Sequence, residues 1–217
     1  QREIVWPDPV RHGPATAPGP DPALIDRAAE LLTSARQPVI LYGRGARDAG
    51  AMAARVELAE RLGAAMISDL KAGTMVPTDH PNHAGPPINK ISPEAREVLR
   101  RSDVILSLGW IDLGGLLAQA FGKDPVAARV IHAGDEAQLH RGWGHEHFAL
   151  SPVDLEFASP SDTVATALLS RIETPRKPAP DIPGRSAGAA PTQQLTMRDV
   201  ATVLRAEVGE TPVTFAA

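Results

Sequence analysis

The chain has 217 residues, of which 43% are hydrophobic but only 4% are aromatic, so a core built from it consists mostly of Ala, Val, Leu and Ile. The net charge of −4 and the lack of a basic run argue against a nucleic-acid-binding surface. The sequence has no Cys, which excludes disulfide frameworks and thiolate metal sites, and no apolar run approaches the roughly 18 residues of a membrane helix.

No signal-peptide pattern opens the chain, so we expect a cytoplasmic protein without membrane contact. The first residue is Gln1 rather than Met, and we expect a piece of a longer protein.

Prolines mark the expected domain boundaries. Six of the 21 prolines lie in residues 1–22 and five more lie in 175–191, and dense proline favours extended linkers over packed elements. We therefore expect a first linker over 1–22 and one domain over 23–174. A second linker over 175–194 and the start of a further domain over 195–217 follow.

Apolar runs alternate with helix-like segments through the domain body. Apolar spacing and capping residues predict helices over 23–34, 49–62, 93–99, 163–172 and 197–208, the fourth capped by Ser161 or Asp162. Continuous apolar runs predict strands over 38–42, 65–68, 103–108, 128–132, 153–157 and 212–215. Strands without polar alternation are typical of a parallel sheet covered by helices on both faces. The predicted fold class is α/β: a three-layer, doubly wound, mainly parallel, Rossmann-like domain.

A Gly-rich turn, Gly43-Arg44-Gly45, follows the first strand. Open α/β sheets bind ligands at the carboxyl ends of their strands, where glycines let the backbone approach a phosphate. Gly109 and Asp135 follow the third and fourth strands at the same edge, and a carboxylate there can accept hydrogen bonds from ribose. The candidate cofactor-binding residues are thus Gly43, Gly45, Gly109 and Asp135. The competing interpretation is a tight turn without a ligand, with Asp135 as a turn residue.

Histidines gather in two segments, His80 and His83 in one and His140, His145 and His147 in the other. A His-x-His pair on a strand can bind a metal ion, but no acidic residue joins it at a convincing spacing, so we expect no metal site. The sequence has no Gly-x-Ser-x-Gly, Walker loop or His-Glu-x-x-His either, and we predict no catalytic residue in it.

Five segments carry a family resemblance: LLTSARQPVILYGRGA, LAERLGAAMISDLKAG, VPTDHPNHAG, LRRSDVILSLG and ARVIHAGDE. Together they resemble the central domain of thiamine-diphosphate-dependent enzymes of the acetolactate synthase type. The resemblance covers 23–172. Residues 1–22 look like the linker from that family's pyrimidine-binding domain, and 196–217 look like the start of its diphosphate-binding domain.

The resemblance implies a DHS-like NAD/FAD-binding fold and a full-length lyase or transferase that assembles as a homodimer or homotetramer. Its small-molecule substrates would be 2-oxo acids or acyl donors, converted by decarboxylation or carboligation. It also implies thiamine diphosphate and Mg²⁺, bound by the outer domains, while the central domain is structural.

The cofactor motifs of that family are missing from this chain. The diphosphate motif is Gly-Asp-Gly followed downstream by Asn, whereas the nearest string here is Gly134-Asp135-Glu136 and the only asparagines, Asn82 and Asn89, lie upstream. The catalytic Glu of the first domain is absent too. The resemblance therefore implies that this chain is inactive alone.

Two alternatives remain open. Some relatives hold FAD or an ADP-type ligand in the central domain, so the chain can be a non-catalytic nucleotide-binding module. Trp110 and Ile111 stand where FAD-holding relatives place polar contacts, which counts against FAD. The other alternative is an NAD-dependent deacylase of the sirtuin kind, which the missing zinc cysteines disfavour.

Overall fold

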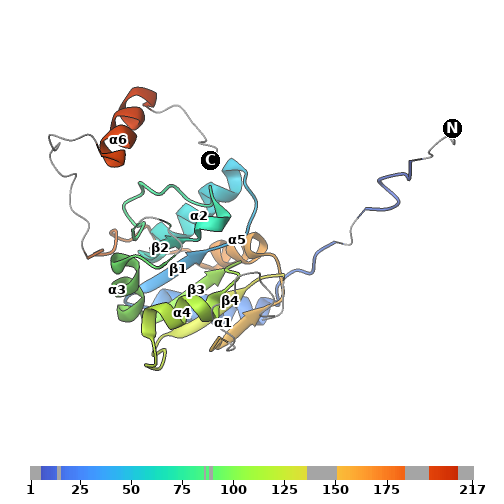
Figure 1. Ribbon diagram of the computed structural model, residues 1–217. Coiled ribbons are helices and arrows are strands. Elements are labelled where there is room, and N and C mark those ends of the chain that lie inside the picture. The colour runs from blue at the N-terminus through green and yellow to red at the C-terminus, as the bar shows by residue number, and fades with distance from the viewer. Residues whose placement is uncertain are drawn as a thin grey trace.

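The computed structural model describes residues 6–13, 16–85, 87, 90–135, 151–183 and 196–209. At its centre lies one parallel sheet between two layers of helices (Figure 1). The strands are β1 (Pro38–Tyr42), β2 (Ala65–Ser68), β3 (Val104–Leu108), β4 (Arg129–Ala133) and β5 (Leu155–Phe157). Their order is β2-β1-β3-β4-β5, and every neighbouring pair is parallel. The predicted three-layer α/β fold is confirmed.

The helices divide between the two faces of the sheet. They are α1 (Pro22–Ser34), α2 (Ala49–Leu62), α3 (Pro93–Arg101), α4 (Leu113–Phe121), α5 (Ser161–Arg171) and α6 (Met197–Val208). The first core lies between the sheet and α1, α2 and α5, and the second lies between the sheet and α3 and α4. Helix α6 stands apart from this sandwich in Figure 1. No helix of the described residues has the length and apolar character needed to cross a bilayer.

Local sequence sets most helix ends. Asp21 caps α1 ahead of a first-turn proline, and the Asp48 carboxylate accepts the Ala51 N–H at the start of α2. Gly63 ends α2 in the left-handed region, with φ 63°, where a residue without Cβ is favoured. The caps at Asp21 and Asp48 and the stop at Gly63 agree with the sequence.

The structure differs from the sequence-based prediction in three places. Helix α4 was not predicted, because Gly114 and Gly115 are poor helix formers and the helix is buried on most sides, so its sequence has no polar face. Helix α5 begins at Ser161 without a side-chain cap, because the side chains of Ser161 and Asp162 form hydrogen bonds with the loop after β1 instead. The fifth strand begins at Leu155 rather than at 153. The strand predicted over 212–215 lies outside the described residues.

Residues 173–183, which we call the strap, lie against the domain, although the sequence predicted a linker from residue 175 onward. The Lys177 N–H donates to the Glu60 carbonyl at 2.8 Å, and the Arg176 guanidinium lies 3.1 Å from the Glu60 carboxylate. Farther along, Ile182 is buried in the second core. The strap thus runs from the end of α5, past α2, to the opposite helical layer.

Candidate functional site

The predicted site residues lie at the carboxyl edge of the sheet, but the backbone N–H groups of Gly43 and Gly109 already have partners. The Gly43 N–H donates to the Leu108 carbonyl at 2.8 Å, and the Gly109 N–H donates to the Ala133 carbonyl at 2.7 Å. These bonds continue the hydrogen bonding between neighbouring strands beyond the ends of β1 and β3. The amides of Gly43 and Gly109 are therefore not directed at a ligand, while Asp135, which follows β4, is exposed.

The two loops at this edge approach each other closely. A Cβ added to Gly43 would lie 2.1 Å from the Gly109 carbonyl oxygen, and one added to Gly109 would lie 2.2 Å from the Arg44 carbonyl oxygen. Gly109 also has φ 70°, a conformation that L side chains rarely adopt. Loop-to-loop packing alone therefore requires glycine at both positions.

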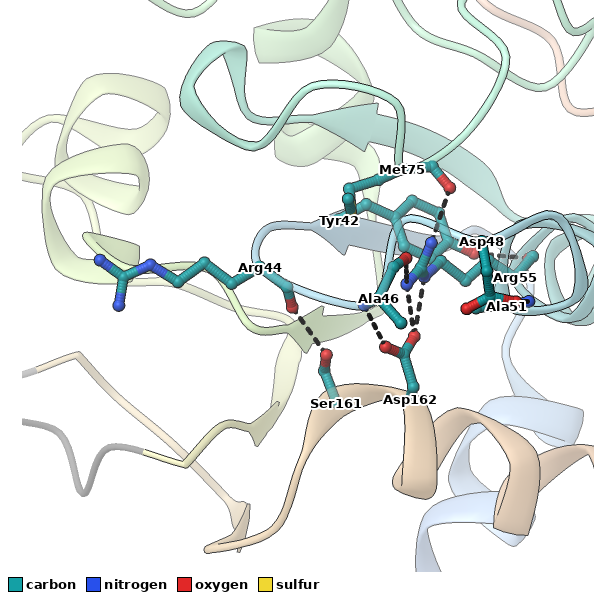
Figure 2. Close-up of polar contacts among 9 residues, drawn as sticks. All are labelled: Tyr42, Arg44, Ala46, Asp48, Ala51, Arg55, Met75, Ser161 and Asp162. Atoms are coloured by element: carbon teal, nitrogen blue, oxygen red, sulfur yellow. Dashed lines mark hydrogen bonds and ion pairs between the residues drawn. The ribbon is translucent and has the colours of Figure 1, made fainter. Parts of the chain in front are cut away.

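Gly45 lies against an ion pair between a buried arginine and a partly exposed aspartate. A Cβ at Gly45 would lie 2.5 Å from Nη2 of Arg55. Arg55, on α2, is only 3% exposed, and its Nη2 lies 2.6 Å from the Asp162 carboxylate at the start of α5 (Figure 2). The third glycine of this edge is thus also explained by packing.

Arg55 joins four segments that are distant in the sequence. Beyond Asp162, its Nη2 donates to the Ala46 carbonyl at 2.7 Å and its Nη1 donates to the Met75 carbonyl at 3.1 Å. The Tyr42 hydroxyl donates to the Arg55 carbonyl at 2.7 Å. Burial raises the pKa of Tyr42 well above its ordinary value, and the Arg55 charge only partly opposes this, so the hydroxyl keeps its proton. Sequence reasoning missed Arg55; an arginine on the predicted apolar side of a helix was its only signal.

The loop after β1 is fixed from the side of α5. The Ala46 N–H donates to the Asp162 carboxylate at 2.6 Å, and the Ser161 hydroxyl donates to the Arg44 carbonyl at 2.7 Å. Figure 2 shows the Arg44 side chain extending away from the ion pair. The loop backbone is therefore preorganised by the protein itself.

Aspartates occupy the helix N-termini at this edge. The Asp48 carboxylate caps α2, and the Asp112 carboxylate accepts the Gly115 N–H of α4 at 2.8 Å. A helix N-terminus attracts anions through its free N–H groups and dipole. Here carboxylates already hold those positions, which disfavours a phosphate at either helix.

A buried polar pair lies within the sheet near the same edge. Ser107 on β3 and His132 on β4 are register partners, and the Ser107 hydroxyl lies 2.9 Å from Nδ1 of His132. Ser107 is fully buried, and Glu156 on β5 is the next register partner of His132. Burial lowers the pKa of His132, and the Glu156 charge only partly offsets this. The pair was not predicted from the sequence, although two polar residues inside apolar runs could have indicated it.

The histidines of the first predicted cluster have structural roles. Nε2 of His83 lies 2.8 Å from the Ser68 hydroxyl, and Nε2 of His80 lies 3.4 Å from the Glu60 carboxylate. The described part of the chain has no group of three or more His, Cys, Asp or Glu side chains placed to hold a metal ion. His140, His145 and His147 lie outside it.

The chain matches a family model described as "Thiamine pyrophosphate enzyme, central domain" over residues 25–142. It belongs to this family. The match takes in the Gly43 turn, the Arg55 ion-pair arginine and both members of the Ser107–His132 pair. The acetolactate-synthase-like resemblance of the sequence is confirmed.

Named relatives agree with the family. The chain is 36% identical over 160 residues to a sulfoacetaldehyde acetyltransferase from Rhodobacter capsulatus, covering 71% of this chain and 25% of the relative. It is 34% identical to an acetolactate synthase from Mycobacterium avium, over 48% of this chain and 17% of the relative. This chain thus spans about a quarter or less of these relatives.

A solved structure shows the same fold at low sequence identity. A benzoylformate decarboxylase from Polynucleobacter necessarius superposes with a TM-score of 0.64 at 20% identity, covering 97% of this chain and 38% of that one. At 20% identity this similarity is evidence for a shared fold and for nothing more.

Thiamine diphosphate, which the family implies, does not fit the residues present here. The chain lacks the Gly-Asp-Gly…Asn motif, and the Gly134-Asp135 turn follows β4 with the Gly134 N–H donating to the Phe157 carbonyl at 3.1 Å. No carboxylate cluster for Mg²⁺ exists among the described residues. Among the residues that the structure describes, none is therefore assigned a step of a thiamine-dependent reaction.

Proposed function

We propose that this chain is the structural central domain of a thiamine-diphosphate-dependent transferase that moves an acyl group from a 2-oxo acid or a related donor. The observation that carries the proposal is the 36% identity to a sulfoacetaldehyde acetyltransferase across 71% of the chain. A lyase activity on 2-oxo acids is the nearest alternative in the same family. Thiamine diphosphate and Mg²⁺ would be held by the regions outside this chain.

The structural role is supported by the way the carboxyl edge is built. Arg55 and Asp162 tie the loop after β1 to α2 and α5. Packing accounts for each of the three candidate glycines. An edge fixed by its own side chains can hold flanking domains in one geometry, which catalytic groups on different domains require.

The nucleotide-binding alternative has weaker support. The four candidate residues lie at the edge where α/β sheets bind ligands. However, the amides of Gly43 and Gly109 have carbonyl partners, and Asp48 and Asp112 place negative charge at the adjoining helix N-termini. Binding of FAD or an ADP-type ligand at Gly43, Gly45, Gly109 and Asp135 stays a prediction.

The test uses the full-length protein that contains this chain, saturated with thiamine diphosphate and Mg²⁺. Sulfoacetaldehyde and pyruvate are supplied separately as acyl donors, each together with inorganic phosphate or a second 2-oxo acid as the acyl acceptor. The consumption of each donor is followed by chromatography. We expect consumption of at least one, and the 217-residue chain alone serves as a control that should consume neither. A folded, cofactor-saturated protein that consumes neither substrate would contradict the proposed activity.

A second measurement tests whether thiamine diphosphate is bound by regions outside this chain. Calorimetry of the isolated chain with thiamine diphosphate and Mg²⁺ should show no more heat than an unrelated protein. Saturable, Mg²⁺-dependent binding at micromolar concentration would show that the cofactor site lies here.

A further inference from the structure

A groove of about 320 Å³ lies at the amino edge of the sheet, opposite the candidate site. The start of β1, the start of β2 and the ends of α1, α2 and α3 form its walls, and the strap crosses it. Its volume is near the lower end of small-molecule sites, which span about 300–1,000 Å³. A dinucleotide is too large for it, whereas a short organic molecule is not.

The floor of the groove is apolar. Val39, Leu62, Ala65 and Val98 lie beneath it and are buried, and the more exposed Ala35, Pro178 and Pro180 complete its apolar surface. Such a floor favours a ligand with a short hydrocarbon part, because contact removes apolar surface from water.

The rim of the groove carries an excess of positive charge. Arg36, Arg101 and Lys177 line it together with one carboxylate, Asp181. Arg101 is occupied, because its Nε donates to Glu97 at 2.7 Å. The side chains of Arg36 and Lys177 have no hydrogen bond or ion pair with any described residue. Within the lining, Arg36 and Lys177 leave one positive charge beyond Asp181, while the Asp103 carboxylate, outside the lining, accepts the backbone N–H groups of Arg36 and Gln37.

Both of these cations start from fixed backbone. The Arg36 N–H donates to the Asp103 carboxylate at 2.7 Å, and the Lys177 N–H donates to the Glu60 carbonyl at 2.8 Å. Lys177 also packs on Gly63, where an added Cβ would lie 3.0 Å from the Lys177 Cβ. The backbone from which each of the two side chains extends is thus fixed at the groove.

We propose that this groove binds a small organic monoanion, such as a short-chain carboxylate, with Arg36 and Lys177 contacting its charged group and the apolar floor contacting its hydrocarbon part. One charge on the ligand matches the single excess charge of the rim. Because Lys177 belongs to the strap, the bound anion joins the strap to the body of the domain. This site is separate from the proposed transferase activity and does not depend on it.

The test is a titration of the ¹⁵N-labelled 217-residue chain with sodium butyrate, followed by NMR at constant ionic strength set with chloride. We expect the amide signals of Val39, Gly63 and Lys177 to shift together, with a dissociation constant in the millimolar range, because exposed ion pairs are weak. Butyramide, which has nearly the same shape without the charge, should bind at least roughly 5-fold more weakly.

Charge-removing variants make the test specific. Arg36→Gln and Lys177→Gln should each weaken butyrate binding by roughly 3-fold or more, and the double variant should abolish it. Lys71→Gln removes an exposed charge that follows β2 at the opposite, carboxyl edge of the sheet, and it should leave binding unchanged. Circular dichroism confirms that each variant is folded. Three outcomes would overturn the proposal. Butyrate and butyramide could bind equally well, or the double variant could bind butyrate as well as the unmodified chain does. The third is that these amide signals do not shift at about 50 mM butyrate, a 50-fold molar excess over protein.

Discussion

Arg55 and Asp162, separated by 107 positions in the sequence, form an ion pair with a nitrogen–oxygen distance of 2.6 Å at the carboxyl edge of the sheet. The arginine side chain is 3% exposed and the aspartate side chain 27% exposed. Their bonds to Ala46 and Met75 connect the loop after β1 with the loop after β2. This pair of charges therefore connects the two loops to α2 and to the start of α5.

Removing one member of this pair should destabilise the domain strongly. We expect Arg55→Ala to lower the free energy of unfolding by about 2–4 kcal/mol, because it leaves the Ala46 and Met75 carbonyls without their donor and removes the charge partner of the partly exposed Asp162. Urea denaturation followed by circular dichroism measures the loss. Arg129→Ala is the matched control. It removes an exposed pair with Asp154, and we expect a cost below about 1 kcal/mol. Equal effects of the two substitutions would mean that the Arg55–Asp162 pair has no special role.

A methyl group at Gly43 should disrupt the contact between the two loops. The Cβ of Gly43→Ala would lie 2.1 Å from the Gly109 carbonyl, and backbone cannot move aside as easily as a side chain. We expect a loss of at least about 3 kcal/mol in the free energy of unfolding, or failure to fold. Gly19→Ala, with no atom within 4 Å of the new Cβ, should change stability by under about 0.5 kcal/mol. A well-folded Gly43→Ala with wild-type stability would refute the close approach.

The stability of the domain should depend on pH through His132. Burial lowers its pKa, so the folded state holds fewer protons on this residue than the unfolded state does. The stabilisation is complete above the ordinary histidine pKa of about 6.5. It is lost as the pH falls below that value toward the lower folded-state pKa, by no more than about 1.4 kcal/mol per pH unit. His132→Gln should flatten this slope in urea denaturation between about pH 7 and pH 5. An unchanged slope would place the titrating group elsewhere.

Nucleotides should bind poorly at the carboxyl edge. We expect titration of the chain with FAD, ADP and CoA to show no binding tighter than millimolar, because Asp48 and Asp112 occupy the helix N-termini. Fluorescence and calorimetry measure this directly. Micromolar binding that Asp135→Ala weakens by roughly 2–10-fold would instead identify the edge as a nucleotide site.

The sequence was informative where a residue acts through its immediate neighbours. Asp21, Asp48 and Gly63 set helix ends locally, and continuous apolar runs indicated the parallel sheet. The Arg55–Asp162 pair could not be predicted, because its members meet only after α2 and α5 pack side by side. The Gly43 turn had a recognised pattern, yet the pattern does not distinguish approach to a phosphate from approach to another loop. The Gly109 carbonyl, which faces Gly43 in the folded structure, shows that the turn approaches another loop.

The segment around Asn82 has a consequence for how the folded chain meets other chains. The Met66 N–H donates to the Asn82 carbonyl at 2.7 Å, and the Ala84 N–H donates to the Met66 carbonyl at 2.8 Å, so this segment covers the outer side of β2. At the other end of the sheet, β5 has only three residues. An exposed sheet edge is a template for aggregation, and short or covered edge strands remove that template. The Asp-His-Pro-Asn-His stretch therefore protects the domain against edge-to-edge association, even where it takes no part in chemistry.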